Sequence, residues 1–511
     1  MKKLATSSIT RITGMATGMD TDSIVKKLMD VEKIPLNKLK QQQQKQTWLS
    51  DAYRQWNKDL LSFQSNTLFN MKLSSAYNTF DVTSSLSNSI SGTATSSAIA
   101  GTYTVAVNRI AESATFTGNK VQLDPSKPLG DGTDSVLTTI KIKDNNDSTK
   151  TIDIDIKNSD TLNDVISKFN SAKDSSGKSL GLQAIYDGKL QQFILKTKAT
   201  GDETKIDFGQ TSQEGQDFFK NILGFEELSK SGKNADITFN GNQITSLSSN
   251  NVTIMGISLT LKSPTLDAAG NPLTSTINVS QNIDAEVKNI QDFVNKYNDL
   301  LDKLNKALDE QFYKDYPPLT DDQRKDLSEK QIEQWEEKAK SGLLRRDSIL
   351  TDMMNKLRSA MGAIVSNGST YNSLGSIGIS SKSYQDRGKL YIDEKKLREA
   401  IQADPDGVRT LFSQIGDTDK GTNGVVQRLS DVMTQGIKDL TKKAGVTGSS
   451  LYDQSVIGKL LANIQKDITR QNSRMFDKEN QYYKQFAAME AAVNKFNSQG
   501  SWLYSQFNSG Q

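Results

Sequence analysis

The sequence contains no cysteine and no histidine among its 511 residues. The missing cysteines exclude disulfide bonds, thiol nucleophiles and thiolate metal ligands, and the missing histidines exclude imidazole ligands and a Ser-His-Asp triad. Any catalysis would have to rest on carboxylate, lysine or hydroxyl groups. Because a chain without cysteine is indifferent to redox conditions, its composition does not indicate a compartment.

Long apolar runs and an excess of charge of either sign are also missing. No segment approaches the roughly 18 apolar residues that a membrane-spanning helix needs, and 63 basic against 60 acidic residues leave a net charge of +3. The sequence therefore predicts neither a membrane span nor electrostatic binding of nucleic acid. Polar residues and Arg11 interrupt the N-terminal stretch, so no cleaved secretory signal is expected. Alone, this indicates a cytoplasmic protein or one exported without a cleaved signal.

Helical heptad patterns are present near both ends of the chain. In the N-terminal part, apolar side chains recur at steps of four and three at Leu49, Tyr53, Trp56, Leu60 and Phe63. The C-terminal seam, with a stutter after its sixth member, comprises Ile457, Leu461, Ile464, Ile468, Met475, Tyr482, Phe486, Met489, Val493 and Phe496. Because such seams require a partner helix, we expect the two termini to pair into one stalk. Two unrelated amphipathic helices are the alternative.

Three further segments of the helical regions predict specific structure. Pro35 predicts a break or kink in the N-terminal helix, and with the glutamine run at 41–44 it predicts a hinge. A helical period returns over 282–308. The charged segment 309–342, called the insert below, is expected to be a loop with one short solvated helix.

The middle of the chain has the period of β-strands. Residues 101–111 alternate, residues 139–157 and 181–201 read as hairpins, and residues 161–172 read as a short helix capped by Thr161. A further β stretch over 235–263 turns at Asn240-Gly241. These patterns predict an α+β multidomain fold, with two β-rich head domains inserted between terminal helices that form a coiled-coil-like leg. The predicted segments are a flexible docking helix (1–45), a leg helix (46–78), a head β domain in two parts (79–122 and 234–280), an inserted outer domain (123–233), a helical leg domain (281–454) and a docking helix (455–511).

Candidate binding motifs are weak. Gly177-Lys178-Ser179 resembles a phosphate loop, but Ala172 stands where such a loop needs glycine. The glycines at 14 and 18 fit neither nucleotide-binding spacing, and Asp20 suits a helix N-cap better. Residues 402–413 lack the first and last charged ligands of a calcium loop, so Asp404 to Gly407 is expected to be a turn. Asp153 and Asp155 read as an exposed strand face. The sequence therefore predicts no catalytic residue, metal or cofactor.

Several stretches resemble one family, the flagellar filament cap proteins, also called flagellar hook-associated protein 2. The N-terminal motif of that family is matched here by Gly14, Gly18, Met19, Asp20, Ser23, Ile24, Val25, Leu28, Glu32, Pro35 and Leu36. Residues 101–116 are similar to the strand that opens the family's head, and 160–201 to a module shared with flagellins. The stretches 256–263, 282–304 and 374–413 resemble its C-terminal half in order and spacing.

The resemblance implies a non-enzymatic, self-assembling protein at the tip of a growing flagellum, outside the cell and exported without a cleaved signal. Implied partners are further copies in a ring, flagellin, the hook-associated junction proteins and an export chaperone at the C-terminal helix. The cap would retain emerging flagellin and promote its folding and polymerisation. An adhesin acting through the β head, or a hook–filament junction protein, are the alternatives.

Overall fold

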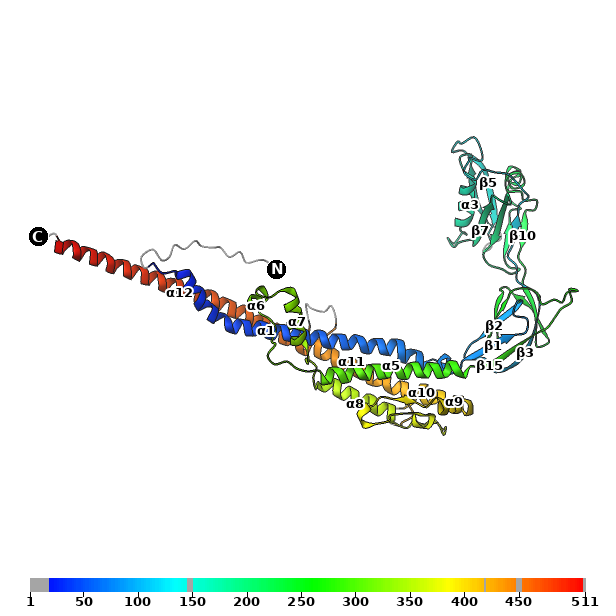
Figure 1. The fold of residues 1–511 in the computed structure, drawn as a ribbon. Helices are drawn as coiled ribbons and strands as arrows, with labels where there is room; N and C mark the ends of the chain where they lie inside the picture. The colour runs from blue at the N-terminus through cyan, green and yellow to red at the C-terminus, as the bar shows by residue number, and fades with distance from the viewer. Residues whose placement is uncertain (1–17, 145–149, 418–419, 447–452, 509–511) are drawn as a thin grey trace. The chain divides into compact units, whose positions relative to one another are not determined.

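The computed structural model describes residues 18–144, 150–417, 420–446 and 453–508. The chain forms two compact units (Figure 1): a helical unit from the residues up to Leu73 and from Asn289 onward, and a β-rich unit from Ser74 to Lys288. The predicted α+β multidomain class is thereby confirmed, with both terminal helices in one unit. None of the described helices combines the length and apolar character that crossing a bilayer requires.

The helical unit is built mainly from long amphipathic helices. Its elements are α1 (Thr21–Ser62), η1 (Phe63–Leu68), α2 (Phe69–Lys72), α5 (Ile283–Asp309, from Asn289 onward), α6 (Asp321–Lys325), α7 (Glu329–Lys340), α8 (Ser348–Gly362), η4 (Gly375–Ile377), β16 (Ile379–Ser380), η5 (Tyr384–Asp386), β17 (Tyr391–Ile392), α9 (Glu394–Ala403), α10 (Pro405–Ser413), α11 (Val425–Ala444) and α12 (Val456–Asn508). Helix α5 confirms the helical period predicted over 282–308, and its Phe293 meets Phe412 of α10 edge to face with ring centroids 5.9 Å apart.

Helix α1 runs without interruption through Pro35, so the predicted break there is wrong. Proline removes one backbone donor and strains a helix interior, but packing on both sides of it outweighs this cost: Met29 and Leu36 are both buried. The expected boundary between residues 45 and 46 lies inside this helix.

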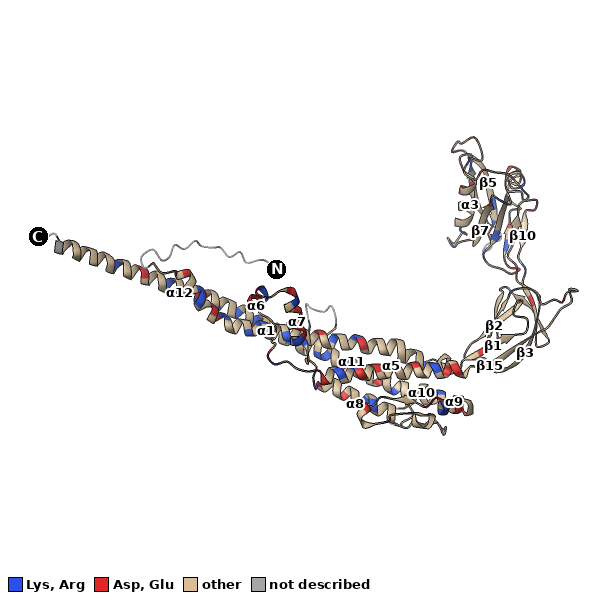
Figure 2. Ribbon diagram, in the orientation of Figure 1, with Lys and Arg blue, Asp and Glu red and all other residues tan. Residues whose placement is uncertain are grey.

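The insert holds two short helices, α6 and α7, where one was predicted. Each begins with a capping box, at Thr320 and Ser328 respectively. Acidic and basic residues are frequent along this segment (Figure 2), and Ala339 is the one buried residue of α7. The low apolar content of the insert hid its second helix from the periodicity argument.

The described residues of the β-rich unit form fifteen strands and several short helical segments, ahead of the first residues of α5. They are η2 (Ser74–Ala76), β1 (Phe80–Ser84), β2 (Ile90–Ala94), β3 (Gly101–Arg109), β4 (Thr115–Thr117), β5 (Val136–Lys143), β6 (Thr151–Lys157), α3 (Leu162–Ser171), β7 (Leu182–Asp187), β8 (Gln192–Thr197), β9 (Lys205–Asp207), α4 (Gln213–Phe218) continued by η3 (Phe219–Leu223), β10 (Ser229–Ser231), β11 (Ala235–Phe239), β12 (Asn242–Leu247), β13 (Asn251–Ile254), β14 (Ile257–Leu261) and β15 (Ser275–Gln281).

Two antiparallel sheets of this unit share one core. The order is β1-β15-β3-β11-β12 in one sheet and β13-β14-β2 in the other. Tyr103 and Phe239 of the first sheet and Leu259 of the second belong to a single buried cluster, as in a sandwich. The hairpin of β11 and β12 turns at Asn240 and Gly241, both with positive φ, which is the turn that the sequence predicts.

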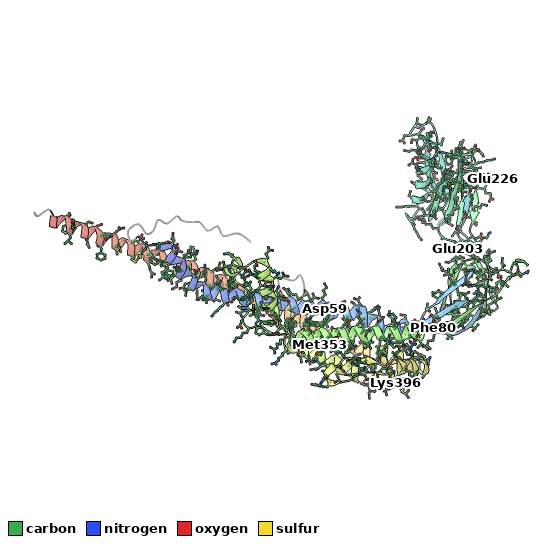
Figure 3. The ribbon with its side chains drawn as sticks, viewed as in Figure 1. Asp59, Phe80, Glu203, Glu226, Met353 and Lys396 are labelled. Atoms are coloured by element: carbon green, nitrogen blue, oxygen red, sulfur yellow. The ribbon has the colours of Figure 1, made fainter. Side chains whose placement is uncertain are left out.

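A second core lies in the inserted module. The hairpins β5–β6 and β7–β8 are confirmed, and Thr161 caps α3 as predicted. The core begins earlier than the expected boundary at residues 122 and 123, because β4 pairs with β8 and places Phe116 opposite Leu195. Phe116 is 5.0 Å from Phe225 between ring centroids, so residues 114–117 belong to the inserted module. In Figure 3, Phe80 marks β1 of the sandwich and Glu226 marks the inserted module.

Candidate assembly interface

The N-terminal motif forms the first turns of α1. Asp20 is the N-cap, and its carboxylate accepts a hydrogen bond from the Ser23 amide at 3.0 Å. Val25 and Leu36 are buried, Ser23, Ile24 and Glu32 are half-buried, and Leu28 and Pro35 are exposed. Gly18 has a φ of +67°, which favours glycine, and Gly14 lies outside the described residues. Because Asp20 accepts from the Ser23 amide and Asp22 adds a second carboxylate in the first turn, the motif starts a helix whose end repels a phosphate.

Helices α1 and α12 lie side by side and run antiparallel. Leu36 packs with Ile464 and Ile468 in one buried cluster, which Met475 covers. At the far end of the pair, the Tyr482 hydroxyl donates to Glu32 Oε1 at 3.1 Å, and the Tyr483 hydroxyl donates to Asp22 Oδ1 at 3.0 Å. The hydrogen bond to Glu32 raises the pKa of Tyr482. The N-terminal motif is thus the partner of the C-terminal seam.

The N-terminal seam pairs with a different helix, α11. Tyr53, Trp56, Leu60 and Phe63 are buried and Leu49 is half-buried. Asn57 Nδ2 donates to Thr441 Oγ1 at 3.0 Å, and Gln64 Nε2 donates to Thr434 Oγ1 at 2.9 Å. The predicted pairing of the two terminal helices is thus confirmed. Along its length, α1 is covered first by α12, as at Gln43, whose Nε2 donates to Gln465 Oε1 at 2.8 Å, and then by α11, as at Ser50, whose Oγ donates to the Ala444 carbonyl at 3.4 Å.

A glycine and an ion pair stabilise the packing of α1 on its neighbouring helices, and neither was predicted from the sequence. A Cβ on Gly436 of α11 would lie 2.8 Å from Met353 Sδ of α8 and 3.6 Å from Leu60 Cδ1 of α1. Figure 3 labels Met353 on its helix. Where α11 ends, Arg54 Nε donates to the Ala444 carbonyl and Arg54 Nη2 to Asp453 Oδ2, each at 3.0 Å. A glycine inside an amphipathic helix was the available signal for the first contact.

The insert packs on α1 over residues 40–48. Lys40 Nζ lies 2.6 Å from Asp321 Oδ2, and Gln41 Nε2 donates to the Pro318 carbonyl at 2.8 Å. Lys340 stands over the Trp48 ring, 5.0 Å from its centroid. These contacts cover the glutamine run, the region expected to act as a hinge.

The last turns of α12 lie beside no other described helix or strand (Figure 1). Ile457, Ile464 and Ile468 are buried and Leu461 is half-buried, whereas Met475, Tyr482, Phe486, Met489 and Val493 are half-buried and Phe496 is 70% exposed. Leu503, one heptad beyond Phe496, is 48% exposed. The apolar stripe that α1 covers near Ile464 thus continues uncovered toward the C-terminal end, where an assembly partner could bind.

The candidate motifs of the sequence take part in local structure. The described residues contain no group of three acidic side chains that could hold a metal ion. In the loop of Gly177, the amides of Ser176 and Lys178 donate to Asp174, which fills the place of a phosphate. Asp404 caps α10 by accepting from the Gly407 amide at 2.8 Å, and Pro405 to Gly407 form the first turn of that helix. The expected turn over 404–407 is therefore wrong: the two short helices are separated by Asp404 alone. Asp153 is exposed and lies 2.9 Å from Lys141 Nζ.

Comparison with known proteins shows the family. The model described as Flagellar hook-associated protein 2 N-terminus matches residues 17–114, and that described as Flagellar hook-associated protein 2 C-terminus matches residues 232–498. The Flagellar hook-associated protein 2 of Halalkalibacterium halodurans is 30% identical, over 97% of this chain and 99% of that protein. The protein of the same name from Escherichia coli K12 is 28% identical, over 97% of each.

A solved structure has the same fold. The crystal structure of the flagellar cap protein FliD D1-D2-D3 domains from Escherichia coli superposes with a TM-score of 0.51 at 22% identity, and covers 81% of this chain and 99% of that one. Most of the chain therefore follows a known architecture. Both family models and a nearly full-length relative confirm the resemblance seen in the sequence: the chain belongs to the flagellar hook-associated protein 2 family.

Proposed function

We propose that this chain caps the distal end of a growing bacterial flagellar filament as a structural protein without catalysis of its own. Membership of the flagellar hook-associated protein 2 family supports this role, as does the fold shared with a structure described as a flagellar cap protein. The cap works outside the cell, at the filament tip, and reaches it by export without a cleaved signal. It retains exported flagellin and promotes its folding and polymerisation.

The observation that carries the proposal is the uncovered end of α12. Phe496 and Leu503 continue a stripe whose earlier members are buried against α1. Exposed Trp502 and Tyr504 add aromatic surface beside it, at 62% and 71% exposure. An amphipathic helix end of this kind gains stability by packing on another helix. We assign this packing to the filament end, with further copies of the chain forming a ring around it.

The same helix end suits the other expected partners. During export it is the surface for a chaperone, which would shield Phe496 and Trp502 from water. The hook-associated junction proteins would also contact the cap through this end of α12. An adhesin role of the β head remains an alternative that could coexist with capping.

A deletion strain tests the proposed function. Without the gene, cells are expected to build few or short filaments and to release monomeric flagellin into the medium, and the gene supplied in trans restores filament length. Full-length filaments without flagellin release would contradict capping. Normal filaments combined with lost surface attachment would point to the adhesin.

A further inference from the structure

A groove of about 750 Å³ opens in the helical unit, away from the pairing helices. Its walls are the end of α5, the turn before α8, α8 itself and the short helix η5. Leu308 and Met354 supply apolar surface, and Tyr384 stands at the rim with 92% of its surface exposed. Arginines from three separate segments, Arg346, Arg358 and Arg387, line the same groove.

The charge in the groove is predominantly positive. Asp309 is the one carboxylate among its lining residues, and it pairs with Arg387. Arg346 and Arg358 make no side-chain hydrogen bond or ion pair within the part of the chain that the structure describes. Two guanidinium groups with ten N–H donors between them therefore face the groove without an acceptor from the protein.

The backbone holds these arginines in place. Arg346 has a φ of +55°, and its amide donates to the Leu308 carbonyl at 3.1 Å. Arg387 has a φ of +51°, and its amide donates to the Tyr384 carbonyl at 3.1 Å. Non-glycine residues adopt this left-handed conformation infrequently, at a cost in free energy. The strained backbone at two of the three arginines is compatible with a functional constraint on their positions.

The third arginine is fixed by close packing. A Cβ on Gly388 would lie 2.8 Å from both Cγ and Nε of Arg358, so the glycine lets the arginine stem lie flat against the backbone. The segment that carries Gly388 is itself anchored, because the Leu390 amide donates to Asn298 Oδ1 at 2.9 Å and Asn298 Nδ2 donates to the Leu390 carbonyl at 2.8 Å. The groove is therefore largely formed before any ligand binds.

We propose that this groove binds an extended acidic peptide segment of a partner protein. Two carboxylates of the segment would accept hydrogen bonds from Arg346 and Arg358, which suit planar bidentate acceptors. An apolar side chain between them would cover Leu308 and Met354, with Tyr384 closing over it. The apolar floor of Leu308 and Met354 favours such a peptide over a polyphosphate, which has no apolar group to place there.

The test measures fluorescence anisotropy of a labelled, unstructured peptide that alternates Asp with Leu, titrated with the full chain. A peptide with Asn at every Asp position is the ligand control. The variant Arg346→Gln/Arg358→Gln removes both unpaired charges. Arg345→Gln is the protein control, because Arg345 is the exposed neighbour of Arg346 and lies outside the groove lining.

We expect saturable binding of the Asp peptide that weakens at least about tenfold in the double variant, in the Asn peptide and at high salt, and that Arg345→Gln leaves unchanged. Because the stem of Arg358 is packed, Arg346→Glu at an exposed position provides a second variant if Arg358→Gln lowers the unfolding temperature. Equal binding of both peptides, equal loss in Arg345→Gln, or no saturation would overturn the proposal. A change of oligomer size in the double variant without peptide binding would also overturn it and would make a second copy the occupant. These outcomes do not depend on capping, because the isolated chain is measured.

Discussion

Arg54 and Asp453 join three helices of the helical unit, α1, α11 and α12. Arg54 on α1 reaches the carboxylate of Asp453, just before α12, with 3.0 Å between Nη2 and Oδ2, and it also satisfies the last carbonyl of α11 at Ala444. The Asp453 side chain is only 12% exposed. The Ser455 amide donates to the same carboxylate at 2.9 Å, so it also positions the first turn of α12.

Replacing Asp453 by Asn is expected to destabilise the helical unit by about 1–3 kcal/mol, because a charge-assisted hydrogen bond is lost and Arg54 keeps as its counter-charge only the exposed Asp51, 3.8 Å from Nη1. Denaturant unfolding at neutral pH measures this. The matched control is Asp467→Asn, which removes the carboxylate of an exposed pair with Arg470 on α12 and should change stability by less than about 0.5 kcal/mol. Equal changes in the free energy of unfolding would show that the Arg54–Asp453 pair contributes no more stability than an exposed ion pair.

The same carboxylate predicts a dependence on pH. Burial opposes ionisation of Asp453, but hydrogen bonds from Ser455 and the charge of Arg54 hold its pKa below the usual value. A lowered folded-state pKa contributes stability that is present above the unfolded value, near 4, and is lost as pH falls through the folded value. The stability difference between the natural chain and Asp453→Asn should therefore shrink between neutral pH and about pH 3. A difference that stays constant over this range would contradict the ionic origin of the effect.

Local signals in the sequence predicted local structure well. Thr161 caps α3, and Asn240-Gly241 turns the β11–β12 hairpin, because a capping hydroxyl and a positive-φ glycine act within a few residues. The heptad at 49–63 correctly indicated that a partner helix exists. It could not indicate which one, since α11 and α12 both carry apolar stripes. In the structure, Leu60 packs near Gly436 of α11, and Leu36 packs on Ile464 and Ile468 of α12.

Features that depend on contacts between distant segments could not be predicted from the sequence. Pro35 is tolerated because its neighbour Leu36 is buried against α12. This is a tertiary contact, which helix propensity does not include. The arginine groove brings together residues of the turn before α8, of α8 and of the segment after η5, and no spacing rule connects them. The insert has too few apolar residues to reveal α7 by periodicity.

Gly436 is expected to be the least replaceable position of α11. Gly436→Val would place a branched side chain against Met353 and Leu60, and overpacking there should cost about 1–3 kcal/mol. Gly500→Val on α12 is the control, because a Cβ there meets no atom within 4 Å. It should change the free energy of unfolding by no more than about 0.5 kcal/mol. A stable Gly436→Val chain would mean that α8 and α11 can separate without cost.

Trp335 is expected to stabilise the insert without contributing to the global stability of the helical unit. Its ring lies 4.7 Å from that of Tyr316 between centroids, and its Nε1 donates to the Pro317 carbonyl at 2.8 Å. Trp335→Ala should speed hydrogen exchange in α7 and in the neighbouring part of α1 that the insert covers, with little change in global unfolding. Trp335→Phe, which keeps the ring contact, should show a smaller increase. A large drop in global stability would indicate that the insert is part of the main core.

The free end of α12 gives the sharpest test of how the chain docks. Phe496→Ser with Leu503→Ser should leave thermal unfolding unchanged, because both side chains are exposed and lie beyond the contacts of Tyr482 and Tyr483 with α1. The same substitutions should reduce retention of the chain on filament tips, because they remove the apolar stripe that the partner covers. Lys495→Ser, an exposed neighbour outside the stripe, is the control. Retention is measured by immunogold labelling of filament ends and by flagellin released into the medium. Normal retention of the double variant, with Lys495→Ser also normal, would move the docking surface away from this helix end.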